Sequence, residues 1–317
     1  MKRFAFASSL ALASVLAAGG ASASAAPTPG TSCTMFPANN VWNMDVSALP
    51  VNAKNLAWKK SSGAGSAFLH PDFGPPDYGI PFDVVSDAHP TESISFTYAD
   101  ESDPGPYPFG ADTQIEGGSD RHALMVNGDT CTLFELYDAR WNGGIPKAGS
   151  GAVFDLTSNA LRPATWTSAD AAGLPILPGL VRYDEVQAGS IDHAIRFTVS
   201  CTRNRFIWPA RHEAGVGDRS CPPMGARFRL KSSFDITGYP ADAQVVLRAM
   251  QRYGLLVADN GSDWYFQGTV DASWTYAFVD ALKRIPARQF QAVDESGCKV
   301  DPDSGVFAYG PSCPAPS

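Results

Sequence analysis

Six cysteines behind a predicted export signal constrain the fold of this chain more than any other feature. They are Cys33, Cys131, Cys201, Cys221, Cys298 and Cys313. An even number of cysteines in an exported chain is typical of disulfide bonds. Proximity in the sequence favours one bond between Cys201 and Cys221 and another between Cys298 and Cys313, which leaves Cys33 for Cys131. No C-x-x-C spacing occurs, so the cysteines do not indicate a zinc or redox motif.

The export signal has the three parts of a secretory signal peptide. A basic start at residues 1–3 precedes an almost wholly apolar run at residues 4–18, and small-x-small cleavage sites fall within residues 21–25. The apolar run is shorter than the ~20 residues that a membrane span needs. We therefore expect removal of residues 1–25, a disordered lead-in over residues 26–32, no membrane span, and a secreted protein, either extracellular or periplasmic.

Composition favours short strands over long helices. The chain has 29 glycines and 25 prolines, is 11% aromatic and is only 18% charged. Such a composition is typical of many short strands joined by tight turns, and a hydrophobic content of 44% is too high for a disordered chain. We expect a mostly β fold, a β-sandwich or jelly-roll-like domain with a short helical C-terminal flank.

Alternating apolar residues and turn signals locate the expected strands. The predicted strands occupy residues 80–85, 93–99, 122–126, 131–137, 152–156, 181–186, 194–199, 206–208 and 226–230. Asn127-Gly128 lies between two of them and is a strong hairpin signal. Ala188-Gly189 predicts the turn of a second hairpin, between residues 181–186 and 194–199.

The last third of the chain predicts two helices. Pro240 suits a first helical position, and apolar residues then recur at helical spacing, which indicates a helix near residues 240–253. A similar pattern predicts a second helix near residues 274–285. Because the two helices are too small to bury a core of their own, we expect residues 33–317 to form a single β-rich domain. A division into two domains near residue 236 is the alternative.

A cationic block stands out in an otherwise acidic chain. The chain has a formal net charge of −8, yet residues 182–231 are rich in basic side chains. These are Arg182, Arg196, Arg203, Arg205, Arg211, Arg219, Arg227, Arg229 and Lys231. A locally cationic surface can concentrate an anionic ligand, so the block favours an anionic polysaccharide. Nucleic acid is not expected for an exported protein with a pI near 5.1.

The first predicted hairpin carries three candidate catalytic residues. His122 and Glu135 lie on opposite arms, where they could face one another, and Tyr137 shares a strand face with Glu135. A histidine beside a carboxyl group is a common arrangement for moving protons. The sequence leaves the register open, so Arg121 could pair with Glu135 instead, as a surface ion pair.

A second group of candidates lies in the cationic block. Trp208 offers a flat face for a sugar ring, Arg211 can bind a carboxylate with two hydrogen bonds, and the imidazole of His212 can move a proton. We therefore assign His212 a catalytic role, and assign substrate binding to Trp208, Arg211, Arg196 and His193. Strand alternation places His193 and Arg196 on opposite faces. The alternative is that Arg211 forms an exposed ion pair and His212 has no function.

Asp259 and Trp264 complete the candidate site. Residues 255–258 are apolar and predict a buried strand, and Asp259 follows it, where a carboxyl group suits catalysis, but Asp-Asn-Gly is also a common turn sequence. Trp264 could form part of a ligand-binding wall.

Two metal sites are weaker alternatives. His122, His193, His212 and Glu135 would make an N3O ligand set, but none of the histidines have ligand-type spacing. Acidic residues 100–116 could bind calcium, but they lack the glycine-punctuated calcium loop. We therefore expect neither a metal nor another cofactor.

Three segments resemble a group of exported bacterial proteins. They are FPANNVWN at residues 36–43, YADESDPGPYP at residues 98–108 and DNGS at residues 259–262. The resemblance spans residues 36–266. It implies one continuous secreted unit and brings no activity with it.

Export, aromatic content and the candidate residues together favour a carbohydrate-active enzyme that cleaves glycosidic bonds in an extracellular polysaccharide. Hydrolysis, which is favoured, needs two carboxyl groups. The candidates for them are Glu135, Asp138, Glu213 and Asp259. The first alternative is a polysaccharide lyase, in which Arg211 would neutralise a uronate while His212 or Tyr137 removes a proton. The second alternative is a glycan-binding or surface module without catalysis.

Overall fold

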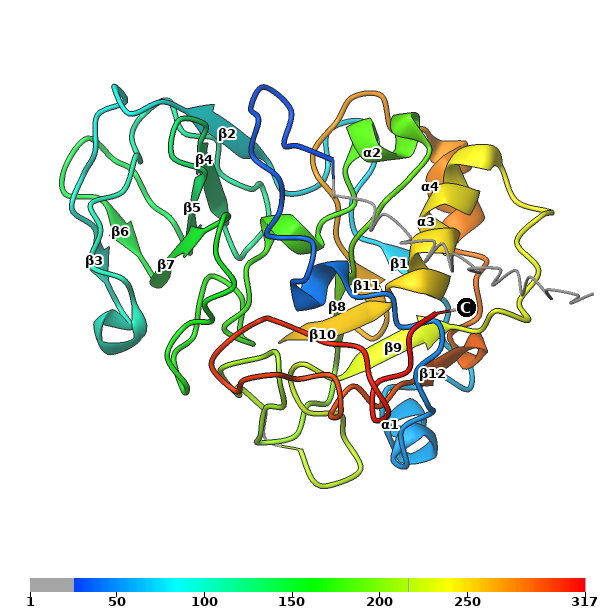
Figure 1. Ribbon diagram of the computed structural model, residues 1–317. Helices are drawn as coiled ribbons and strands as arrows, with labels where there is room; N and C mark the ends of the chain where they lie inside the picture. Colours follow the sequence, from blue (N-terminus) through cyan, green and yellow to red (C-terminus); the bar gives the residue numbers. More distant parts are fainter. Residues whose placement is uncertain (1–25, 216, 317) are drawn as a thin grey trace, which may run out of the picture.

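Two β-sheets contain most of the strands of the described residues. The computed structural model describes residues 26–215 and 217–316, so the predicted signal peptide, residues 1–25, lies outside the described residues. Figure 1 shows the smaller sheet on the left and the larger sheet in the centre, with helices grouped beyond the larger sheet. No helix in the described part of the chain is both long and apolar enough to cross a membrane.

The smaller sheet has four strands in the order β2-β4-β5-β7. Its strands are β2 (Phe82–Val85), β4 (Ala123–Asn127), β5 (Thr132–Tyr137) and β7 (Ser150–Asp155). β4 and β5 are antiparallel, with Asn127 opposite Thr132, so the predicted first hairpin is confirmed. A separate pair of short parallel strands, β3 (Ser95–Phe96) and β6 (Lys147–Ala148), lies beside this sheet.

The larger sheet has six strands in the order β1-β11-β8-β10-β9-β12. Its strands are β1 (His70–Pro71), β8 (Ile195–Val199), β9 (Arg227–Leu230), β10 (Leu255–Asn260), β11 (Tyr265–Phe266) and β12 (Phe290–Ala292). β8 and β10 pair in parallel, as do β1 and β11. Together the two sheets confirm the expected mostly β class. The jelly-roll arrangement is not confirmed, because jelly rolls are built from antiparallel strands.

Four α-helices and four short 3-10 helices complete the regular structure of the described residues. They are η1 (Val41–Asn43), α1 (Asn55–Ser61), η2 (Ala99–Glu101), η3 (Leu177–Gly179), α2 (Tyr183–Ala188), α3 (Ala241–Arg252), α4 (Tyr276–Leu282) and η4 (Ala287–Gln289). α3 and α4 confirm the predicted C-terminal helices. α3 contacts β9, α2 and α4, so the helical flank covers the larger sheet rather than standing apart from it.

The predicted second hairpin is wrong, because residues 183–188 form α2 instead of a strand. Acidic residues Asp184 and Glu185 lie in the first turn, where they favour a helix N-terminus. Gly189 ends the helix with a positive φ of 87°, a conformation that costs glycine little. The strand after it, β8, pairs with β10 instead of with residues 181–186.

The core spans both sheets. Its main cluster joins apolar side chains of the smaller sheet, such as Phe154, to side chains of the larger sheet, such as Phe197 and Phe228. A second, smaller cluster packs Tyr107 and Phe109 against the opposite face of β4 and β5. Tyr107 and Phe109 belong to the acidic loop that follows β3. Their packing therefore holds this loop at a defined position beside the smaller sheet.

All three predicted disulfides are present. Cys33 is bonded to Cys131, Cys201 to Cys221 and Cys298 to Cys313. They fit an exported protein.

The lead-in, residues 26–32, lies against the body of the protein. Thr28 is fully buried, and the Ala26 carbonyl oxygen accepts a hydrogen bond of 3.2 Å from Arg182.

Replacing Cys201 and Cys221 together by serine is expected to lower the free energy of unfolding by about 3 kcal/mol, because the bond restricts the unfolded chain. The bonded residues are 20 positions apart. The matched control replaces Cys298 and Cys313, which are 15 positions apart, and should cost about as much. Urea unfolding followed by tryptophan fluorescence measures both. A loss confined to the control would show that the first bond contributes nothing to stability.

Candidate functional site

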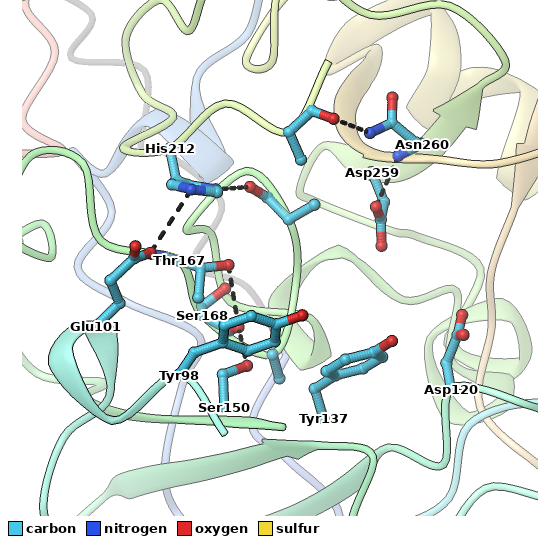
Figure 2. Close-up of a pocket in the computed structure, with 13 residues that line it drawn as sticks. Tyr98, Glu101, Asp120, Tyr137, Ser150, Thr167, Ser168, His212, Asp259 and Asn260 are labelled. Atoms are coloured by element: carbon cyan, nitrogen blue, oxygen red, sulfur yellow. Dashed lines mark hydrogen bonds and ion pairs between the residues drawn. The ribbon is translucent and has the colours of Figure 1, made fainter. Parts of the chain in front are cut away.

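A pocket of about 430 Å³ opens between the two sheets. Figure 2 shows side chains from both sheets and from three loops converging on it. Its polar lining residues are Tyr98, Glu101, Asp120, Tyr137, Ser150, Thr167, Ser168, His212, Asp259 and Asn260. Three of these are carboxylic acids, and no lysine or arginine among the described residues lines the pocket. The pocket is therefore acidic and partly aromatic.

Asp259 reaches the pocket because β10 is irregular at this point. Val257 pairs with Phe197, but Asp259 pairs with the next residue, Thr198, so a β-bulge lies between Val257 and Asp259. A bulge re-aims the side chain that follows it, whereas regular alternation would place Asp259 on the same face as the buried Val257. The Asp259 side chain is 24% exposed. Burial and the nearby charge of Asp170 raise its pKa to about 7.

Glu101 and His212 face each other on another wall of the pocket. Glu101 ends η2, at the start of the anchored acidic loop, and its Oε2 accepts a hydrogen bond of 3.0 Å from the Thr167 backbone N–H. The His212 Nε2 lies 3.6 Å from the same oxygen, while His212 Nδ1 donates to the Ala171 carbonyl oxygen at 2.8 Å. Both side chains are thus held in place by backbone groups.

Tyr98, Tyr137 and Asp120 form the wall nearest the smaller sheet. In Figure 2 the two tyrosine rings stand beside one another and Asp120 lies next to Tyr137. Tyr98 is 53% exposed. Burial and the charge of Asp120 raise the pKa of Tyr137. Two tyrosine rings beside carboxyl groups suit a ligand that combines apolar ring faces with hydroxyl groups.

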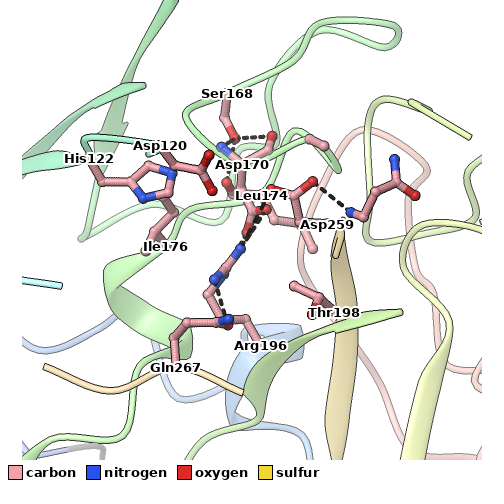
Figure 3. A network of polar contacts seen from close by, with 12 residues as sticks. Asp120, His122, Ser168, Asp170, Leu174, Ile176, Arg196, Thr198, Asp259 and Gln267 are labelled. Carbon is pink, nitrogen blue, oxygen red and sulfur yellow. Dashed lines mark hydrogen bonds and ion pairs between the residues drawn. The ribbon is translucent and has the colours of Figure 1, made fainter. Parts of the chain in front are cut away.

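A buried ion pair lies directly behind Asp259. Asp170 is fully buried and accepts two hydrogen bonds from Arg196, from Nε at 2.8 Å and from Nη2 at 2.9 Å. Arg196 Nη1 also donates to the Gln267 side chain at 2.6 Å. Figure 3 shows this arginine between Asp170 and Gln267, with Asp259 alongside. The Arg196 Nη2 is 4.0 Å from the nearest Asp259 oxygen.

Of the two pairings that the sequence left open for Glu135, with His122 or with Arg121, the structure has neither. The register places Glu135 opposite Leu124, and His122 instead forms a 2.7 Å hydrogen bond with Glu116. Burial lowers the pKa of His122, but the charge and hydrogen bond of Glu116 outweigh burial and raise it. Glu135 is fully buried, and its carboxyl group accepts hydrogen bonds from the Ile176 and Leu177 backbone N–H groups.

Burial raises the pKa of Glu135 to about 7 in spite of these hydrogen bonds. Neither His122 nor Glu135 lines the pocket. Neither side chain therefore reaches a ligand in it.

The predicted cationic surface is also wrong, because five of its nine side chains are buried. They are Arg182, Arg196, Arg211, Arg227 and Arg229. Each is neutralised by a carboxylate or bonded to backbone carbonyl oxygens, as Arg227 is paired with Glu295 at 3.0 Å. A run of charged residues in a sequence does not show which of the side chains are exposed. In the fold these arginines connect segments of the chain, and they leave no cationic surface over the pocket.

The remaining predicted substrate-binding residues lie away from the pocket. Trp208 and Arg211 line a different cavity, of about 600 Å³, and the Arg211 guanidinium is held by the Pro302 carbonyl oxygen and the Asp303 carboxylate. Trp264 is fully buried in the core. His193 is fully buried, and its Nε2 lies 3.1 Å from a Glu185 carboxylate oxygen. Of the predicted residues, His212, Asp259 and Tyr137 come together at the pocket.

The histidines do not converge on a metal site. His122, His193 and His212 contact three different carboxylates, those of Glu116, Glu185 and Glu101. In residues 26–215 and 217–316, no three His, Cys, Asp or Glu side chains are grouped closely enough to hold a metal ion.

Sequence reasoning missed Asp170 and assigned Glu101 and Asp120 no role in a shared site. Asp170 is a lone charge among apolar residues at 169–177, and a lone charge in an apolar segment is a signal for a buried, paired group. Glu101 and Asp120 carry no such signal, because acidic loop residues are usually solvated. Only the folded chain places them opposite Asp259.

Comparison with protein-family models, with curated proteins and with solved structures found no match to this chain.

Proposed function

We propose that this protein is a secreted glycoside hydrolase that cleaves a neutral extracellular polysaccharide in the pocket beside Asp259. The observation that carries the proposal is the presence of three carboxyl groups in one aromatic pocket, of which Asp259 has a pKa raised to about 7. Glycoside hydrolysis needs one protonated and one ionised carboxyl group on either side of the bond. A carboxyl group whose pKa is raised by burial is typical of the acid in such a pair.

Asp259 is the general acid in this proposal. Near neutral pH it retains a proton that it can donate to the glycosidic oxygen as the bond breaks. Glu101 or Asp120 then acts as the nucleophile or activates a water molecule, because both line the same pocket. Tyr98 and Tyr137 provide ring faces against which sugar units can pack.

The pocket favours hydrolysis over β-elimination. Elimination from a uronate requires a cation that neutralises the sugar carboxylate. Arg211, the residue expected to do so, is held by Asp303 and lines the other cavity. Arg196 is already paired with Asp170. An acidic pocket without a free cation would repel a uronate, so we propose a neutral substrate and not an anionic one.

A binding module without catalysis is the second candidate function. The exposed ring of Tyr98 would serve either function. A carboxyl group with a strongly raised pKa in a pocket is more typical of an active site, so Asp259 favours the enzyme.

The proposal predicts that the secreted protein releases new reducing ends from a neutral polysaccharide. The test incubates the protein with glucan, mannan, xylan and arabinan, and with polygalacturonate and alginate. Reducing ends and the ultraviolet absorbance of unsaturated uronates are measured in parallel. We expect reducing ends from at least one neutral glycan and no unsaturated product. Unsaturated products would identify a lyase, and retention on a glycan column without cleavage would identify a binding module.

A further inference from the structure

Among the described residues, Arg196 is the only arginine or lysine within 4.0 Å of an Asp259 carboxylate oxygen, and its hydrogen bonds are directed to other side chains. Two of its nitrogens donate to Asp170 and the third donates to Gln267. The distance of 4.0 Å between Nη2 and Asp259 is too long for a hydrogen bond. A guanidinium at this distance would ordinarily favour the ionised form of a carboxyl group. The bidentate pair with Asp170 cancels most of that effect.

We propose that Asp170 is a positioning residue that holds the Arg196 guanidinium in a closed ion pair and so keeps it from pairing with Asp259. The catalytic role of this arrangement rests on the proposed function. The electrostatic effect of Asp170 and Arg196 on Asp259 does not. Asp170 touches no ligand in the pocket, since it is fully buried behind Asp259. It acts through Arg196, which without Asp170 would have Asp259 as its nearest carboxylate.

The other groups around Asp259 cannot replace Asp170 in this role. The titratable and charged groups that face Asp259 are Asp170, Arg196, His122, Asp120 and Tyr137. His122 is paired with Glu116, Tyr137 is uncharged near neutral pH, and Asp120 is exposed at the open pocket, where solvent screens its charge. Asp170 is fully buried and in direct contact with the nearest cation, so its charge is the least screened.

The test replaces Asp170 by asparagine, which keeps the shape and removes the charge. Arg196 then has Asp259 as its remaining carboxylate neighbour, and we expect the acid dissociation constant of Asp259 to rise at least tenfold. Carboxyl 13C NMR titration of labelled protein measures this constant, and the Asp259 signal is assigned from its absence in Asp259→Asn. The matched control is Gln267→Met, which removes a neutral hydrogen bond from the same guanidinium and should leave the constant within threefold.

An unchanged titration of Asp259 in Asp170→Asn would overturn the inference. If that variant does not fold, Gln267→Glu provides the opposite test, because a second carboxylate on Arg196 should lower the dissociation constant of Asp259. No change in Gln267→Glu would equally overturn it. These titrations need no substrate, so the inference can hold while no glycan is cleaved. If a glycan is cleaved, the alkaline limb of the rate profile should move to lower pH in Asp170→Asn, whereas a purely structural role would lower the rate without moving it.

Discussion

Replacing Asp259 by asparagine is expected to lower the rate of glycan cleavage about a thousandfold, because the variant has no proton to donate to the leaving oxygen. Asparagine keeps the size of the side chain and can still accept the 2.6 Å hydrogen bond from the Asn260 backbone N–H. The fold should therefore be retained. Initial rates of reducing-end release on the glycan that the wild type cleaves fastest measure the effect.

The matched control is Asp138→Asn, the same chemical change just beyond the end of β5. Asp138 is paired with Arg140 outside the pocket and has a positive φ of 47°, which asparagine tolerates well. We expect its activity to remain within threefold of the wild type. Equal losses in the two variants would show that removal of any nearby carboxylate has the same effect and that Asp259 is not the acid.

The pH dependence follows from the same group. Asp259 donates only while protonated, and its pKa is raised to about 7. Activity should therefore be present below pH 7 and fall as the pH rises through about 7, with a lower limit set by the carboxyl group that must be ionised. In Asp259→Asn the alkaline limb should disappear. Aryl glycosides with an acidic leaving group need little protonation, so the variant should lose far less activity on them.

The sequence predicted the parts of this fold that depend on local chemistry. Asn127-Gly128 located the first hairpin, Pro240 the start of α3, and spacing located the disulfides. The strand prediction for residues 181–189 was wrong. The alternation of apolar residues suits a strand, but the acidic first turn and Gly189 suit a helix equally well. Packing of Tyr183 on Trp274 settles the choice, and that contact joins residues far apart in the chain.

The site was harder to predict because distant segments build it. Asp259 was recognised as a strand-end carboxyl group, but the bulge that turns it toward the pocket has no sequence signal. The arginines were recognised as a cluster, but alternation cannot show that Arg196 would be buried against Asp170. A sequence shows how many charged side chains the fold must accommodate. Which of these side chains contact a ligand is decided by tertiary contacts.

Replacing Arg196 by methionine is expected to lower the free energy of unfolding by about 3–5 kcal/mol at neutral pH, because it leaves the Asp170 carboxylate buried without a partner. Asp170 is fully buried and accepts two side-chain hydrogen bonds from Arg196, its counter-ion. Removing both charges, in Arg196→Met with Asp170→Asn, should recover most of the loss, since neutral side chains need no counter-ion. Urea unfolding of the wild type, the two single variants and the double variant measures these free energies as a double-mutant cycle.

The loss in Arg196→Met should also depend on pH in a defined direction. Burial already raises the pKa of Asp170 in spite of Arg196, and removing the cation raises it further. The folded variant then holds a proton that the unfolded chain releases at lower pH, so its stability is greatest in acid and falls as the pH rises toward the folded-state pKa. The deficit relative to the wild type should therefore be smaller at acid pH than above neutrality, and absent from the double variant. A deficit that is the same at every pH would mean that lost packing, and not an unpaired carboxylate, destabilises the variant.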